Sequence, residues 1–230
     1  MCTDSILKLK TTDYCTNYVF LGEAGCGKSE LAINFACALA ANTKSPIHFF
    51  DLDMTKILFR ARDQISVLNT YNVLAHYEEQ FMDVPALVGG VSEKLKGQNC
   101  FTILDVGGDA IGAKAIGGYA KLLNSYSTIY YIINPFRPWS TTTQHVKHIF
   151  STILNVSHLN LSHVHLIANP NLGIATTIED IIAGLKDVEA FSKELKAIEF
   201  LCARTELCEE LKKYISYPII SIDMHMTTYQ

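Results

Sequence analysis

Short apolar runs and longer amphipathic segments alternate along the chain. The short runs, such as YVFL at 18–21 and YYII at 130–133, are rich in β-branched and aromatic residues, which is typical of buried strands. The longer segments carry apolar residues at helical spacing, and the first of them is rich in alanine, a strong helix former. We therefore predict strands at 17–22, 46–52, 72–75, 100–105, 127–133, 163–168 and 217–222, and helices at 28–41, 84–96, 110–124, 141–155, 176–190 and 205–213.

The alternation of strands and helices indicates the fold class. Successive strands that are separated by helices form right-handed crossovers and a parallel sheet. A hydrophobic content of 49% with only 18% charged residues fits a sheet that is covered on both faces. We expect an α/β three-layer sandwich with a mostly parallel sheet. Because the chain has no internal repeat and no Gly/Ser linker, we expect a single domain over residues 1–230.

Charge and composition exclude several classes of function. The formal net charge is −4 and no run of Lys and Arg is present, so we expect no nucleic-acid binding. No apolar run approaches the ~20 residues of a membrane-spanning helix, and the first ten residues are too polar for a secretory signal. The last ten residues lack a basic amphipathic face, so we expect no membrane attachment. Seven scattered cysteines without a C-x-x-C pair predict reduced thiols in a cytoplasmic protein.

One stretch has the signature of a phosphate-binding loop. GEAGCGKS at 22–29 matches G-x-x-x-x-G-K-[ST] between a predicted strand and a predicted helix, as the P-loop NTPase fold requires. In such a loop, backbone N–H groups and the helix N-terminus face the phosphates, Lys28 reaches the β- and γ-phosphates, and Ser29 binds Mg²⁺. The predicted nucleotide-binding residues of this stretch are Gly22, Glu23, Ala24, Gly25, Cys26, Gly27, Lys28, Ser29 and Glu30.

Acidic residues follow two other predicted strands. In FTILDVGGD, Asp105 ends a strand and suits an aspartate that holds Mg²⁺ through water, while the N–H of Gly108 would meet the γ-phosphate. An ordinary turn after a buried strand is the alternative. In FFDLD, either Asp51 or Asp53 could approach Mg²⁺ or orient the attacking water. We choose Asp53 because it lies further beyond the strand, and Asp51 would then brace the loop.

The order of these segments resembles a known family. The phosphate loop is followed by DLD at 51–53, ILDVGGD at 103–109, IINP at 132–135 and LIANPN at 166–171. This order is similar to that of MinD/ParA-like P-loop ATPases, also called CobQ/CobB/MinD/ParA-like, of the SIMIBI class, over residues 17–222. The resemblance implies a slow ATPase that binds ATP or ADP with Mg²⁺, acts as a switch on a partner protein, and forms a nucleotide-dependent homodimer. It implies catalytic roles for Lys28, Asp53 and Asp105 and Mg²⁺ binding by Ser29, Asp53 and Asp105.

One position departs from the family. Members that dimerise through a deviant loop carry a lysine where this chain has Glu23. A carboxylate there repels phosphate oxygens unless it turns away, so the dimer stays an open question. Arg60 and Arg62 are candidates for the lost positive charge, although a solvated helix face explains them equally well.

The segment LIANPNLG bears on the choice of base. Asn169 lies where P-loop proteins place a base-reading asparagine, and a strand-end turn is the alternative. GTP-binding relatives place an aspartate three residues further on, where this chain has Leu172. An apolar side chain cannot accept the hydrogen bonds of guanine, so we expect ATP with Asn169 at the adenine.

Other readings remain open from the sequence. The loop NPFRPWSTTTQ, with Asn134 and Arg137, is either a partner-contacting surface or a packed crossover, and a nucleotide contact by Asn134 is a third alternative. We expect ordinary imidazoles rather than a metal site from His145 and His148. The alternative functions are a small-molecule ligase, synthase or kinase on the same scaffold, and a scaffold that has lost hydrolysis.

Overall fold

A computed structural model describes residues 3–9, 15–53, 64–77, 89–138, 140 and 142–225. Within these residues, eight strands form one sheet in the order β3-β2-β4-β1-β5-β6-β7-β8, and every neighbouring pair is parallel. The strands are β1 Asn17–Gly22, β2 Ile47–Leu52, β3 Leu74–His76, β4 Phe101–Val106, β5 Ser127–Ile133, β6 Val164–Ala168, β7 Ile198–Arg204 and β8 Ile219–Ile222.

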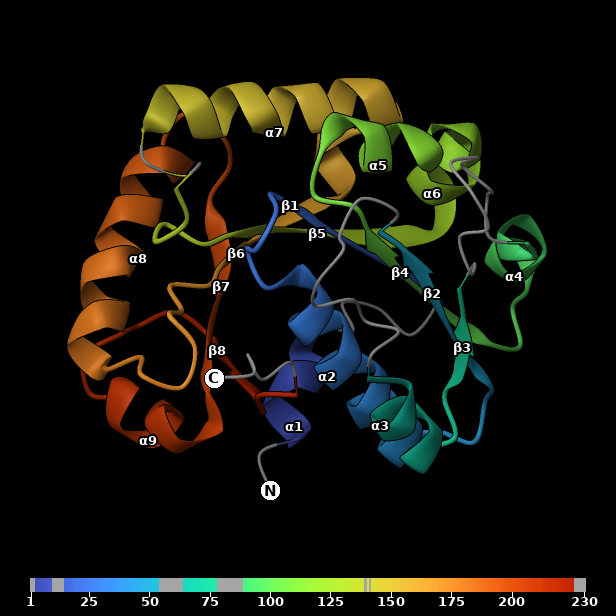
Figure 1. Ribbon diagram of the computed structural model, residues 1–230, viewed down its shortest axis with the longest axis horizontal. Coiled ribbons are helices and arrows are strands. Elements are labelled where there is room, and N and C mark those ends of the chain that lie inside the picture. Colours follow the sequence, from blue (N-terminus) through green and yellow to red (C-terminus); the bar gives the residue numbers. More distant parts are fainter. Residues whose placement is uncertain are drawn as a thin grey trace.

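Helices cover both faces of this sheet, which gives three layers (Figure 1). One face of the sheet, where Tyr18 and Phe20 of β1 are buried, is covered by α1 Thr3–Ile6, α2 Lys28–Asn42 and α3 Ile65–Thr70. The opposite face holds α4 Val91–Lys96, α5 Ala110–Ala115, α6 Ala120–Tyr126, α7 Thr143–Ser157, α8 Ile178–Ser192 and α9 Cys208–Leu211. Short 3-10 turns lie at Leu7–Leu9, Gly117–Tyr119, Leu161–His163 and Thr205–Leu207. The predicted α/β fold with a parallel sheet is confirmed.

Alternation along the strands builds the two cores. In β1, Tyr18 and Phe20 point toward α2, while Val19 and Leu21 belong to the core on the other face. All four side chains are fully buried because β1 lies in the middle of the sheet. The ring of Tyr18 meets Phe35 of α2 edge-on at 4.6 Å, which fixes the helix that follows the phosphate loop.

The predicted elements agree with the structure in most places. All seven predicted strands are present, with their ends shifted by two residues at most. The strand β7 was not predicted, because its residues IEFLCAR do not alternate between apolar and polar and its burial follows no period of two. The helix predicted at 110–124 is divided by the turn at Gly117–Tyr119 into α5 and α6. Of the helix predicted at 84–96, residues 84–88 lie outside the described residues.

Among the described residues, none of the helices combines the length and the apolar character that crossing a membrane requires.

Candidate functional site

The loop between β1 and α2 has the backbone conformation of a phosphate-binding loop. Gly22 and Gly27 have φ angles of +143° and +96°, which residues with a side chain rarely adopt. A side chain would also lack space, since a Cβ on Gly22 would lie 2.5 Å from Ile132 O and one on Gly27 would overlap Asn169 Nδ2. The loop ends at Gly27, the N-cap of the 15-residue helix α2. The helix N-terminus therefore adjoins the loop, as anion binding requires.

Lys28 begins α2 and meets a carboxylate from a different strand. Its Nζ lies 3.4 Å from Oδ2 of Asp53, the residue that follows β2, and both side chains are 1% exposed. The backbone N–H of Asp53 donates to Asp51 Oδ1 at 3.0 Å, so Asp51 holds the end of β2 in place. Asp51 therefore supports the residue that contacts Lys28, rather than the loop itself as we expected, and the catalytic role of Asp53 stays a prediction.

Asp105 lies next to Asp51 in the sheet. The two residues are register partners of β4 and β2, so their side chains point to the same face, and both are buried. A Cβ on Gly107, just after β4, would lie 3.3 Å from Asp53 Oδ1, which places Asp53 beside the same strand end. Asp53 thus lies beside the start of α2, while Asp51 and Asp105 occupy neighbouring positions on β2 and β4.

These residues fit a magnesium ion that is also bound by a nucleotide. Carboxylate and hydroxyl oxygens are the ligands that Mg²⁺ prefers, and Ser29 is buried in the first turn of α2. The part of the chain that the structure describes contains no group of three His, Cys, Asp or Glu side chains that could hold a metal ion. Phosphate oxygens and water would have to complete the coordination, as is usual for Mg²⁺ in proteins.

The segment after β4 packs directly against the phosphate loop. A Cβ on Gly108 would lie 2.5 Å from the backbone nitrogen of Ala24 and 2.9 Å from the carbonyl carbon of Glu23. Asp109 caps α5 by accepting a hydrogen bond from the N–H of Gly112 at 2.7 Å. Gly108 therefore lies beside the loop residues where we predicted a γ-phosphate contact.

The carboxylate of Glu23 is bound by the connection between β5 and α7. Its Oε2 accepts from Ser140 Oγ and its Oε1 contacts His145 Nε2, both at 3.0 Å. The side chain is 13% exposed. The expected conflict between this carboxylate and phosphate oxygens is thereby reduced, because Glu23 is held toward α7. His145, for which we expected no special role, is one of its two partners.

Arg137 in the same connection also contacts the loop. Its Nε donates to Gly25 O at 2.7 Å, and its Cδ lies 3.6 Å from the position of a Cβ on Gly25. We did not predict this contact, although one signal was present in the sequence. Arg137 follows β5, and if β5 lies beside β1 in the sheet, its end must lie close to the loop that leaves β1.

Asn169, after β6, braces the loop at a third point. Its Nδ2 donates to Cys26 O at 2.8 Å, and its backbone N–H donates to Ile133 O. The side chain is 3% exposed, and its Oδ1 has no hydrogen-bond partner among the described residues. The adenine contact stays a prediction.

The loop after β6 is itself well ordered by polar contacts. Asn134 donates from Nδ2 to Asn171 O at 2.8 Å and accepts from the N–H of Phe136, so it joins the ends of β5 and β6. Leu172 and Ile174 remain 48% and 65% exposed. The surface beside Asn169 is therefore apolar.

Glu30 and Cys26, which we predicted to bind the nucleotide, are both buried. Glu30 accepts from the backbone N–H of His225 at 2.6 Å, so its carboxylate holds the segment after β8. Cys26 is 1% exposed and packs under the loop. Arg60 and Arg62 lie outside the described residues.

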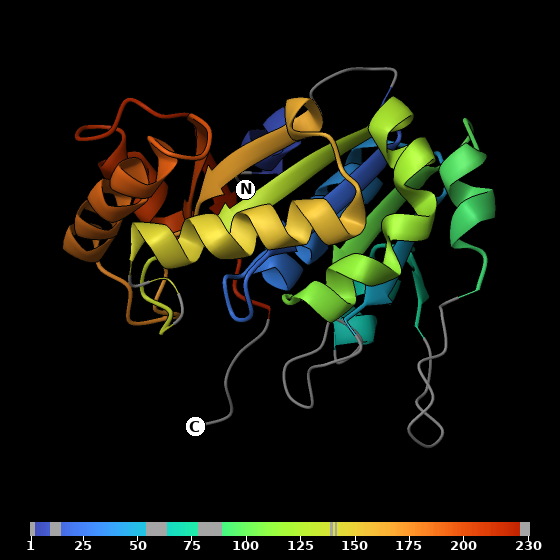
Figure 2. The same ribbon diagram turned by 90° about the horizontal axis from the view of Figure 1, so that it is seen from above.

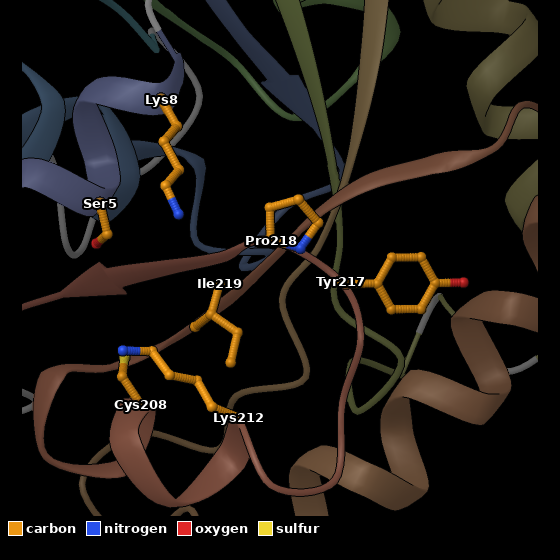
Figure 3. Close-up of a pocket in the computed structure, with 7 residues that line it drawn as sticks. All are labelled: Ser5, Lys8, Cys208, Lys212, Tyr217, Pro218 and Ile219. Carbon is orange, nitrogen blue, oxygen red and sulfur yellow. The ribbon is translucent and has the colours of Figure 1, made fainter.

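A separate hollow lies at the opposite edge of the sheet (Figure 3). It has a volume of about 190 Å³ and is found at the amino end of β8, whereas the phosphate loop follows the carboxyl end of β1. Lys212 at its margin is paired with Glu209 at 2.5 Å. The residues that line it are Ser5, Lys8, Cys208, Lys212, Tyr217, Pro218 and Ile219.

Comparison with known proteins identifies the fold. No protein-family model matches the sequence, and the curated proteins give no match either. Among solved structures, the chain is similar to the signal recognition particle 54 kDa protein from Aeropyrum pernix K1 in complex with GDP, with a TM-score of 0.52 and 12% identity over 86% of this chain and 46% of that chain. It is also similar to the cell division protein FtsY from Thermotoga maritima, with a TM-score of 0.56 and 15% identity over 87% of this chain and 68% of that chain.

This chain spans less than half of the first of these proteins. At such low identity the likeness concerns the fold, and it agrees with the parallel sheet and with the loop between β1 and α2. The chain has the α/β fold of P-loop nucleotide-binding proteins.

Proposed function

We propose that this protein is a P-loop ATPase of the MinD/ParA type that binds Mg²⁺·ATP and acts as a nucleotide-dependent switch on a partner protein. The observation that carries the proposal is the buried contact between Lys28 and Asp53 at the start of α2. In P-loop proteins the lysine of the glycine-rich loop binds the phosphates and an aspartate at a strand end holds Mg²⁺, and the buried pair of Lys28 and Asp53 supports these roles here.

Nucleotide binding would change the surroundings of Lys28. Its ammonium group would gain the β- and γ-phosphate oxygens, while Mg²⁺ would supply the countercharge for the developing negative charge. Ser29 and Asp105 would hold that ion directly or through water. Asp53 would then orient the attacking water or complete the Mg²⁺ shell, so it would act mainly in the transition state.

The switch would operate through the segment after β4. Gly108 touches the loop at Ala24, and α5 begins two residues later. A γ-phosphate that displaces Gly108 would therefore move α5, on which Ile111 is 73% exposed. An exposed apolar side chain on a helix that senses the nucleotide is a suitable contact for a partner protein.

ATP is the proposed nucleotide because Leu172 cannot accept the hydrogen bonds that a guanine would offer. The 54 kDa protein of the signal recognition particle was solved with GDP, so the choice of base is the sharpest point to test.

The experiment titrates Mg²⁺·ATP and Mg²⁺·GTP into the purified protein and into its Lys28→Ala variant, and measures phosphate release. We expect ATP to bind more tightly than GTP, slow hydrolysis, and binding that is weaker by at least about tenfold in the variant. Equal affinity for GTP would overturn the base assignment. Rapid turnover only after a small acid or alcohol is added would favour a ligase or kinase, and the absence of any nucleotide binding would end the proposal.

A further inference from the structure

Two nitrogen atoms of the Arg137 guanidinium have no hydrogen-bond partner among the described residues. Its Nε bonds Gly25 O, but in the described part of the chain its Nη1 and Nη2 atoms make no hydrogen bond or ion pair. Arginine carries its charge at all relevant pH values and presents these nitrogens as a planar fork that matches phosphate oxygens. These two nitrogens, at the margin of a phosphate-binding loop, are therefore suited to bind phosphate oxygens.

The segment that carries Arg137 is held firmly in place. The Asn134 side chain accepts from the N–H of Phe136 and donates to Asn171 O after β6, and the backbone N–H of Ser140 donates to Arg137 O at 2.9 Å. Pro135 and Phe136 pack against Gly184 of α8, where a Cβ would lie 2.7 Å from the Phe136 ring. Because the backbone is fixed, the side chain of Arg137 loses less conformational freedom when it binds a ligand.

The acidic residues around the loop favour a second positive charge at the phosphate-binding site. Glu23 brings a carboxylate into the loop itself, and Asp51, Asp53 and Asp105 are buried nearby. Lys28 is already in contact with Asp53. The phosphate chain of a bound nucleotide adds several negative charges to the loop, and the single positive charge of Lys28 must then interact with both these oxygens and the carboxylates. Figure 2 shows the loop after β1 (blue) and the β5–α7 connection (yellow-green) along the same edge of the sheet.

We propose that Arg137 is a second cationic phosphate-binding residue of this site, which attracts the phosphate chain of the nucleotide from the β5 side while Lys28 binds it from α2. This inference rests on the proposed nucleotide binding and adds a residue that the loop signature does not contain.

The test compares Arg137→Gln and Arg137→Lys with wild type for the affinity of Mg²⁺·ATP and Mg²⁺·ADP at low and high salt. We expect Arg137→Gln to weaken both by about tenfold or more, since a hydrogen bond to a charged group is lost. Arg137→Lys should keep most of the affinity because it keeps the charge. The salt dependence of binding should become flatter in Arg137→Gln only.

Lys147→Gln is the matched control, because it removes one positive charge from α7 at an exposed side chain that pairs with Glu194. It should bind ATP like wild type. If Arg137→Gln binds like wild type, or if it weakens binding with an unchanged salt dependence and a lower melting temperature, Arg137 only braces the loop and the inference is wrong. If wild type binds no nucleotide while it is folded, the proposed function fails instead.

Discussion

Lys28 Nζ and Asp53 Oδ2 lie 3.4 Å apart in the interior of the protein, although the rest of α2 and the whole of β2 separate the two residues along the chain. Burying two charges is costly unless they compensate each other, so each side chain depends on its partner in the nucleotide-free protein. A phosphate group would compete for the same ammonium. Binding of a phosphate group in the loop would therefore alter the contact that Lys28 makes with the end of β2.

The first prediction separates the roles of these two residues. Lys28→Ala should lose ATP binding by at least about tenfold, because Lys28 meets phosphate charge in the ground state. Asp53→Ala should retain affinity, since phosphate oxygens take the place of the lost carboxylate, but should lower kcat by about a hundredfold. Calorimetric titration and phosphate release measure both. If Asp53→Ala turns over like wild type, Asp51 becomes the candidate.

The same substitution should also affect folding. Asp53→Ala leaves the Lys28 ammonium buried without its carboxylate partner, and breaking a buried pair in this way costs about 3 kcal/mol. We expect that fall in the free energy of unfolding in urea titrations without nucleotide. Saturating Mg²⁺·ATP should recover much of it. A stability equal to that of wild type would show that the pair is not formed in solution.

A third prediction concerns the approach of Gly108 to the loop. Gly108→Ala places a Cβ 2.5 Å from Ala24 N, so either the loop or the segment after β4 must move. We expect weaker ATP binding and slower hydrolysis. Gly118→Ala is the control, because apart from its neighbours in the chain none of the described residues has an atom within 4 Å of the position of its Cβ. Equal kinetics for the two variants would argue against a role of Gly108 in the site.

A fourth prediction addresses the base. Leu172→Asp supplies an acceptor for guanine at a position that is 48% exposed, so the fold should tolerate it. The ratio of GTP to ATP affinity should rise in this variant if the base lies beside Asn169. Competition between labelled ATP and unlabelled GTP measures the ratio. An unchanged ratio would place the base elsewhere.

The histidine pair at the sheet edge should make stability depend on pH. His48 Nδ1 lies 2.8 Å from His76 Nε2, and burial lowers the pKa of both below the usual 6.5, with Lys94 nearby adding repulsion. The unfolded chain therefore takes up protons first as the pH falls, and the free energy of unfolding should decrease below pH 6.5. Urea titrations at several pH values test this. His76→Gln should flatten the dependence, and an unchanged slope would contradict the assignment.

The sequence predicted the parts of the site that follow from local patterns. The loop 22–29 is recognised by the spacing of its glycines and lysine, and Asp53 and Asp105 are recognised as acidic residues at the ends of predicted strands. The partners of Glu23 could not, since Ser140 and His145 reach it only through the neighbouring position of β5 in the sheet. The same holds for Arg137 and for the brace from Asn169 to Cys26. Contacts between distant segments depend on strand order, which no local pattern contains.

Successive residues of the phosphate loop are supported by successive strand ends of the sheet. Ala24 is met by the segment after β4, Gly25 by Arg137 after β5, and Cys26 and Gly27 by Asn169 after β6, which is the spatial order of these strands around β1. Much of the conformational entropy of the loop has therefore been lost during folding. A ligand that enters a preorganised cradle spends little of its binding free energy on ordering the protein, so more of that energy remains for affinity.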